Sequence, residues 1–244
     1  MNAGVGILCT AAAVAAGAVG TMIFNAVPAR WLCDYGEQPR KELQQKRIFL
    51  FPHGAVLAVL FAVFFLLSFR QYGNQIRFWA AAGTSIPLAL TGIADLKYRI
   101  IPDEFVFCLF ITGLVFHGGE WVGNGFHPAA LISPLAGAAA GAALMLLMGL
   151  LGRCLYHRDA MGFGDVKLFA AAGFFTGISM ILPFYLMAVF LAFFHILFLF
   201  AAHRMPKDRY FPFGFSICLA LLFFLAFSGQ ISEFIAWYFS LLNL

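Results

Sequence analysis

Residues 168–203 read LFAAAGFFTGISMILPFYLMAVFLAFFHILFLFAAH and contain no Lys, Arg, Asp or Glu. A helix needs roughly 20 apolar residues to cross the hydrocarbon core of a bilayer, so this tract is too long for a single span. Gly177 and Pro183 interrupt it and predict a short first helix followed by a full-length second one. The short helix is expected to end within the bilayer, covered by other segments of the protein. The tract therefore predicts a bundle of membrane helices.

The remainder of the chain has the same character. Its residues are 63% hydrophobic and 11% charged, with a mean hydropathy of +0.91, whereas soluble domains carry about a quarter charged residues. We expect an all-α, polytopic bundle of about eight spans near residues 4–26, 48–69, 78–95, 104–119, 129–151, 166–179, 181–202 and 211–229. Residues 4–26 are interpreted as a retained helix, because the apolar run is long enough to span. The small residues of 136–143 predict close helix packing, and 230–244 either continue the last span or lie at the interface.

The basic residues predict the orientation. Thirteen of the 15 Lys and Arg residues fall in one alternating set of connections, and only Arg70 and Arg77 fall in the other. The positive-inside rule then places the N-terminus outside and the loop 29–47 in the cytoplasm. The sequence pI of about 8.9 reflects these short clusters, so we predict lipid contact and no nucleic-acid partner.

Two acidic residues stand at the ends of apolar runs. Asp95 closes WAAAGTSIPLALTGIAD, and Asp165 follows MGFG and opens VKLFAAAGFF. The predicted topology places both at the cytoplasmic boundary of the membrane. Ionisable groups at such positions are costly and usually face other protein or a water-filled cavity.

A pair of carboxylates brought together can share one proton, because burial and mutual repulsion raise one pKa while the other group stays ionised. The ionised group can accept a proton from water while the protonated group hydrogen-bonds a peptide carbonyl. Asp95 and Asp165 are therefore predicted to hydrolyse a peptide bond without a metal. The competing interpretation of Asp165 alone is that it caps the helix that follows it.

The neighbouring residues are predicted to support this pair. Gly162 and Gly164 allow close approach of a substrate backbone. Lys97 and Lys167 each lie two residues beyond an Asp, where they mark the headgroup boundary or lower an Asp pKa. Asp103, after Pro102, competes with Asp95 for the first catalytic position, but we expect it to cap the helix beginning near Glu104.

Other catalytic chemistries lack their motifs. The six His residues show no ligand spacing, the five Cys residues form no C-x-x-C, and neither G-x-S-x-G nor a Walker-type loop occurs. No metal site is predicted, and His195 is expected to be a hydrogen-bonded core residue.

GFGDVKLFAAAG (162–173), DLKYRIIPDEF (95–105) and FPFG (211–214) resemble three motifs of the type IV prepilin peptidases, aspartyl proteases of the G-x-G-D group (peptidase family A24). The resemblance covers roughly 78–228. It implies that Asp95 and Asp165 are the catalytic pair, with Gly162, Gly164, Lys167, Pro102 and Lys97 as motif residues.

The N-terminal region departs from this family. GAVGTMIFNAVPARWL (17–32) is only loosely like the family's opening segment, Phe215 stands where the third motif usually continues with Pro, and Cys33 is alone where many members carry two C-x-x-C pairs. We therefore divide the chain into residues 1–77, with a short basic loop lacking the Cys-rich zinc domain, a protease core 78–229, and a C-terminal segment 230–244.

The resemblance implies a multi-pass inner-membrane enzyme of type IV pilus or type II secretion systems that cleaves leaders of prepilins or pseudopilins at the cytoplasmic boundary. Many members also N-methylate the new terminus with S-adenosylmethionine, and proteolysis itself is expected to need no cofactor. The alternatives are a presenilin-like protease, whose late Pro-Ala-Leu motif is missing here, a proton- or cation-coupled transporter using the same two Asp residues, and an inactive assembly scaffold.

Overall fold

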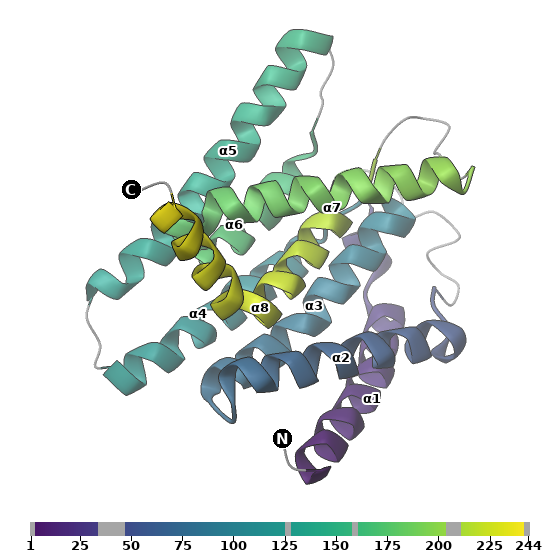
Figure 1. The fold of residues 1–244 in the computed structure, drawn as a ribbon. Helices are drawn as coiled ribbons and strands as arrows, with labels where there is room; N and C mark the ends of the chain where they lie inside the picture. Colours follow the sequence, from purple (N-terminus) through teal and green to yellow (C-terminus); the bar gives the residue numbers. More distant parts are fainter. Residues whose placement is uncertain (1–2, 34–46, 125–127, 158–160, 204–210, 242–244) are drawn as a thin grey trace.

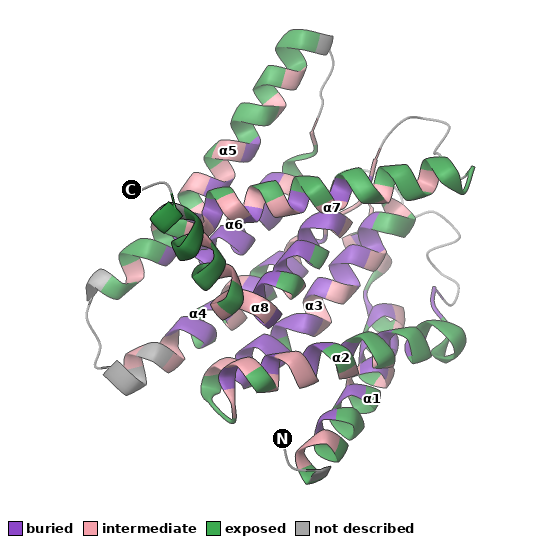
Figure 2. Ribbon diagram, viewed as in Figure 1, coloured by how far each residue is buried: buried purple, intermediate pink, exposed green. Residues whose placement is uncertain are grey.

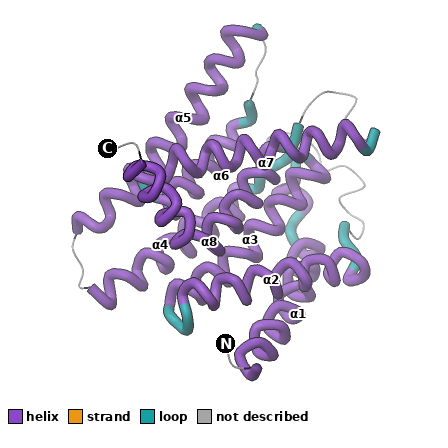
Figure 3. Tube along the Cα trace, in the orientation of Figure 1, coloured by secondary structure: helices purple, strands orange, loops and turns teal. Residues whose placement is uncertain are grey.

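The computed structural model describes residues 3–33, 47–124, 128–157, 161–203 and 211–241, and no strand occurs among them. The main helices are α1 (Ala3–Ala26), α2 (Ala55–Tyr72), α3 (Ile76–Tyr98), α4 (Asp103–Asn124), α5 (Ile132–Tyr156), α6 (Phe163–Thr176), α7 (Ile181–Ala201) and α8 (Phe213–Leu241). Short helical turns occur at η1 (Ala29–Leu32), η3 (Leu50–Gly54), η4 (Pro128–Leu131) and η5 (Ile178–Met180). The predicted all-α class is thus confirmed (Figure 3). Residues 34–46, which form most of the predicted loop 29–47, lie outside the described residues.

The uncharged tract divides where its sequence predicts. α6 ends at Thr176, and Gly177 follows with a φ of 72°, a left-handed conformation that glycine adopts without strain. η5 then leads into α7, with Pro183 in the first turn of that helix. With 14 residues, α6 is only about 21 Å long, shorter than the roughly 30 Å hydrocarbon core.

The chain is a multi-pass membrane protein. Five helical segments are long and apolar enough to cross a bilayer, by length and composition: Gly4–Ala26, Leu50–Tyr72, Ile132–Leu155, Ile178–Ala201 and Phe213–Tyr238. α3, α4 and α6 are not among these five, so the count of eight spans and the orientation of the N-terminus remain predictions.

The core lies around α3, α6 and the first half of α8. These elements are largely buried, whereas much of α5, α7 and the second half of α8 is exposed (Figure 2). The exposed side chains of α7 include Phe190, Phe193 and Phe198, which suit contact with lipid. α8 changes direction at Phe227, whose φ and ψ are non-helical, and continues as a helix to Leu241 (Figure 1).

Glycines bring the short helix α6 against α5. A Cβ placed on Gly137 of α5 would lie 2.3 Å from the carbonyl oxygen of Gly173, and one on Gly141 would lie 2.8 Å from that of Phe169. Because the obstacles are backbone atoms, neither position has room for a side chain. The small residues of 136–143 therefore pack closely, as predicted, and hold α6 in the core.

Asn25, near the end of α1, joins the two edges of the first loop. Its side-chain oxygen accepts hydrogen bonds from the backbone N–H groups of Arg47 (2.8 Å) and Ile48 (3.1 Å), and its amide donates to the Ile48 carbonyl (2.8 Å). The ammonium of Lys97 donates to the Arg47 carbonyl. The N-terminal helices are thereby attached to the end of α3 that carries Asp95.

Candidate active site

Asp95 lies in the last turn of α3 and is only 5% exposed. Its Oδ2 accepts a hydrogen bond of 2.8 Å from the backbone N–H of Phe215, in the first turn of α8. The first amides of a helix have no partner within the helix and favour a negative charge. Asp95 thus binds the start of α8, a contact between positions 120 residues apart.

Asp165 lies in the first turn of α6 and is close enough to Asp95 for the two charges to interact. It precedes the predicted span 166–179, and its Oδ2 would lie 3.5 Å from a Cβ on Gly162. The pKa of the Asp165 carboxyl is raised to about 7, chiefly by burial and then by the charge of Asp95, while a hydrogen bond from the Gly162 backbone opposes both. A carboxyl with this pKa holds its proton near neutral pH, unlike an ordinary Asp.

Two further residues, Cys218 and Ile101, lie close to the starts of both α6 and α8. Cys218 of α8 is buried within electrostatic reach of both Asp95 and Asp165. Ile101 lies against both glycine motifs: a Cβ on Gly164 would be 3.0 Å from its Cβ, and one on Gly214 would be 2.7 Å from its Cδ1. The same Cβ on Gly214 would be 3.0 Å from Oδ2 of Asp95, so this glycine leaves room for the carboxylate.

These contacts change the explanation for the motif glycines. The space in front of Gly164 is filled by Ile101 of this chain, so its lack of a side chain is needed for internal packing before any substrate approaches. Gly162 has φ −74° and ψ 144°, which any residue adopts, and only Asp165 is near its missing Cβ.

The charged neighbours make contacts that the sequence did not predict. Lys167 donates two hydrogen bonds of 2.7 Å to the two carboxylate oxygens of Asp103, at the start of α4. Its ammonium also lies 5.0 Å from the centre of the Phe163 ring. The first amides of α4, those of Phe105 and Val106, are bound by the carbonyl of the buried Pro102. The sequence suggested neither the Asp103–Lys167 pair nor the binding of Lys97 to Arg47.

The prediction that His195 is hydrogen-bonded is wrong within the described residues. Its buried Nδ1 has no hydrogen-bond partner there. Instead its ring packs edge-on against Phe211 and Phe215, with ring centres 4.8 and 5.1 Å apart. These are aromatic residues around Gly214, so His195 supports the third motif from α7 by packing.

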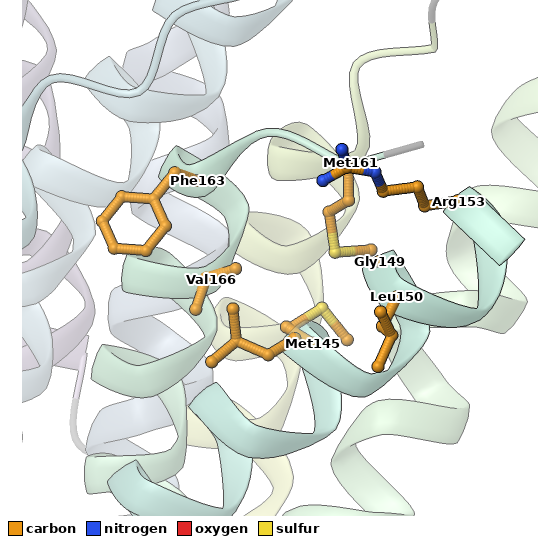
Figure 4. A pocket seen from close by; sticks show the side chains of 8 residues that line it. Met145, Gly149, Leu150, Arg153, Met161, Phe163 and Val166 are labelled. Atoms are coloured by element: carbon orange, nitrogen blue, oxygen red, sulfur yellow. The ribbon is translucent and has the colours of Figure 1, made fainter. Parts of the chain in front are cut away.

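A pocket of about 460 Å³ lies between the end of α5 and the start of α6 (Figure 4). It is lined by Met145, Leu146, Gly149, Leu150, Arg153, Met161, Phe163 and Val166. Asp165 is not among these residues, although it immediately precedes Val166. Among the described residues of this lining, the only ionisable one is the cation Arg153. Among the described residues, no group of three or more His, Cys, Asp or Glu could hold a metal ion.

Comparison with known proteins shows a similarity to one family. A family model described as the type IV leader peptidase family matches residues 82–197, a segment that contains both Asp95 and Asp165. Residues 82–197 are similar to this family. The resemblance inferred from the two aspartate motifs is thus confirmed.

Curated relatives agree. The chain is 34% identical over 164 residues to "Prepilin leader peptidase/N-methyltransferase" of Neisseria gonorrhoeae, covering 65% of this chain and 52% of that protein. It is 35% identical over 135 residues to a protein of the same name from Xanthomonas campestris pv. campestris, covering 55% and 44%. The chain thus spans about half the length of the curated relatives it matches. No solved structure matches it.

Proposed function

We propose that this chain is a membrane-embedded aspartic endopeptidase that cleaves leader peptides of type IV prepilins or pseudopilins at the cytoplasmic boundary of the inner membrane. The observation that carries the proposal is the convergence of Asp95 and Asp165 at the adjoining starts of α6 and α8, within the matched segment. Residues 78–229 would form the protease core, after an N-terminal region of residues 1–77 and before a segment 230–244. The comparisons give no support to the transporter alternative.

The proposed chemistry follows from the different surroundings of the two carboxyls. Asp165, with a pKa of about 7, holds a proton and donates a hydrogen bond to the carbonyl of the peptide bond to be cut. Asp95, bound by the Phe215 amide, is ionised and removes a proton from a water molecule. The water oxygen bonds to the carbonyl carbon, the carbon–nitrogen bond breaks, and the leaving amine takes the proton from Asp95.

The substrate would be a short cytoplasmic leader followed by an apolar helix in the bilayer. That arrangement places the scissile bond at the depth predicted for the two carboxyls. The prepilin or pseudopilin and the surrounding lipid are the proposed partners, and the basic loop 29–47 is proposed to contact anionic lipid rather than the substrate.

Methyl transfer to the new terminus is a separate proposal that rests on the names of the relatives. S-adenosylmethionine carries a sulfonium cation. Among the described residues that line the pocket beside α6, Arg153 is a cation and none is an anion, so these residues do not fit the sulfonium. We assign no described residue to its binding.

The test is cleavage of a prepilin by the detergent-purified chain, with the cleavage site and any N-methyl group read by mass spectrometry. Asp95→Asn and Asp165→Asn should each abolish cleavage, while both proteins still accumulate in the membrane. Glu233→Gln, which changes an exposed acid at the far end of α8, is the matched control and should cleave normally. Full processing by either Asp variant would exclude the proposed pair.

A further inference from the structure

The connector between α3 and α4, residues 99–102, begins next to the turn of Asp95 and lies against Gly164, the neighbour of Asp165. α3 is terminated by Arg99, which has a left-handed φ of 58° and whose N–H binds the Asp95 carbonyl at 2.9 Å. α4 begins at Asp103. The connector is therefore fixed to the Asp95 backbone at one end and leads directly to Asp103 at the other.

Two contacts attach this connector to the turn that carries Asp165. Ile101 occupies the space beside Gly164 and Gly214 and so touches the starts of both α6 and α8. Asp103 accepts two hydrogen bonds from Lys167, which lies two residues beyond Asp165. An apolar contact and an ion pair thus join the same segment to the same turn.

The Asp103–Lys167 ion pair contributes little to the stability of the fold and more to the placement of α4 relative to α6. The side chains of Lys167 and Asp103 are 31% and 41% exposed, and exposed pairs of this kind typically contribute only about 0–1 kcal/mol. Both of its hydrogen bonds converge on the Lys167 ammonium and link the start of α4 to the first turns of α6. Removing one charge should therefore leave the fold intact while loosening the spacing.

We propose that Ile101 and the Asp103–Lys167 ion pair form a positioning clamp that sets the separation of Asp95 and Asp165. The proposal deepens the proposed function and rests on it for its catalytic consequence. The clamp residues do not touch the peptide or the water. They hold the two carboxyls close enough to share one proton, and a misplacement of about 1 Å can cost on the order of 100-fold in rate.

Cross-linking tests the separation without needing activity. In a chain with the five native cysteines replaced, Asp95→Cys and Asp165→Cys are joined by bifunctional thiol reagents of increasing length. Adding Asp103→Asn or Ile101→Ala should shift cross-linking towards longer reagents. Ile100→Ala, at the adjacent connector position, is the matched control and should not. Unchanged cross-linking in both clamp variants would overturn the proposal.

Activity tests the ion pair by rescue. Asp103→Asn and Lys167→Gln should each lower kcat by roughly 10- to 100-fold. The exchange Asp103→Lys with Lys167→Asp, which restores an ion pair, should recover most of the loss. An exchange no better than the single variants would show that these side chains act separately, against the clamp.

The third test is the pH dependence of kcat in Ile101→Ala, a substitution that leaves the charge of the protein unchanged. The ionisable side chains of Asp95 (α3) and Cys218 (α8) are within electrostatic reach of Asp165. The other described charged groups near this turn are Lys167 (α6) with its partner Asp103 (α4), Arg99, which acts on Asp95, and Arg153 (α5) in the pocket that Val166 also lines. If Asp95 moves away, its charge raises the Asp165 pKa less, so the alkaline limb of kcat should move to lower pH. A limb identical to that of the unmodified chain would argue against the clamp.

If the unmodified chain cleaves no prepilin at all, the proposed function fails, while the cross-linking result still decides the clamp.

Discussion

The helix bundle buries polar side chains at both of its ends, but these side chains are paired at one end and include two neighbouring acids at the other. At the His117 end (residues 72–77, 116–117, 174–175 and 225–228), the Tyr72 hydroxyl donates to the Leu225 carbonyl at 2.7 Å. The His117 Nε2 lies 2.8 Å from the carbonyl of Phe174, and Arg77 lies 5.0 Å from the centre of the Phe116 ring. These three side chains each meet a backbone carbonyl or an aromatic ring.

At the Asp95 end (residues 95–103, 162–167 and 211–218), two acids are held near each other instead. The Asp95 carboxylate accepts hydrogen bonds from the backbone of Phe215 and of Gly214, and its charge makes ionisation of Asp165 harder. Such an arrangement costs stability, whereas the pairing at the His117 end contributes to it. The difference fits the proposed function, in which the His117 end stabilises the bundle and the Asp95 end carries the catalytic pair.

The largest effect is expected on kcat, and it should distinguish substitutions at two glycines of α8, Gly214 and Gly229. Gly214→Ala places a methyl group 2.7 Å from Ile101 and 3.0 Å from the Asp95 carboxylate. We expect kcat to fall about 100-fold or more, because the carboxylate must move by an appreciable fraction of an ångström. The measurement is the initial rate of prepilin cleavage per folded protein.

Gly229→Ala at the other end is the matched control. Its methyl group would meet Nε2 of Gln71 at 2.5 Å, the far end of a flexible side chain that can move aside. Cleavage should stay close to normal. Equal losses in the two variants would mean that α8 tolerates no added side chain anywhere, and the comparison between the ends would lose its force.

The second effect is the dependence of cleavage on pH. Asp165 must keep its proton, and its pKa is about 7. The rate should therefore fall about tenfold for each pH unit above that value. A kcat profile measured between about pH 5 and pH 9 with one prepilin would show the limb, and a flat profile to pH 9 would contradict the assigned role of Asp165.

The sequence predicted the helices better than the contacts between them. Hydropathy and the positions of Gly177 and Pro183 predicted the division of the uncharged tract into α6 and α7, and the motifs singled out the two acids that the structure brings near each other. Motif spacing carries no information on lateral contacts, however. Asp103 and Lys167 are 64 positions apart, and Asp95 and Phe215 are 120 apart. Their pairing follows from how α4, α6 and α8 pack, which the hydrophobic pattern of each helix leaves open. For the same reason His195, expected to be hydrogen-bonded, packs on the rings of Phe211 and Phe215.

The third effect tests the stabilising role of the His117 end. His117→Ala leaves the Phe174 carbonyl without this buried partner, which should cost about 1–3 kcal/mol of stability. The kcat of the folded fraction should be unchanged, because the Asp95 end is not altered. Thermal unfolding in detergent gives the first quantity and prepilin cleavage the second. A large loss of kcat with normal unfolding would reverse the roles assigned to the two ends.

The smallest effect concerns the cost of the carboxyl pair itself. The pKa of Asp165 is about 7 in the folded chain and 3.8 for an unperturbed group. Between these values the folded state keeps a proton that the unfolded state releases, so stability falls as pH rises through this window and is then constant. Asp165→Asn cannot ionise and escapes this loss. It should therefore melt higher than the unmodified chain above about pH 7, by roughly 2–4 °C for each kcal/mol, with the difference vanishing near pH 4. Thermal melts of both proteins across this range measure the difference.

An Asp165→Asn variant that melts lower than the unmodified chain at alkaline pH would show that the ionised Asp165 is stabilised by its surroundings. The contrast between a stabilising His117 end and a destabilising Asp95 end would then not hold.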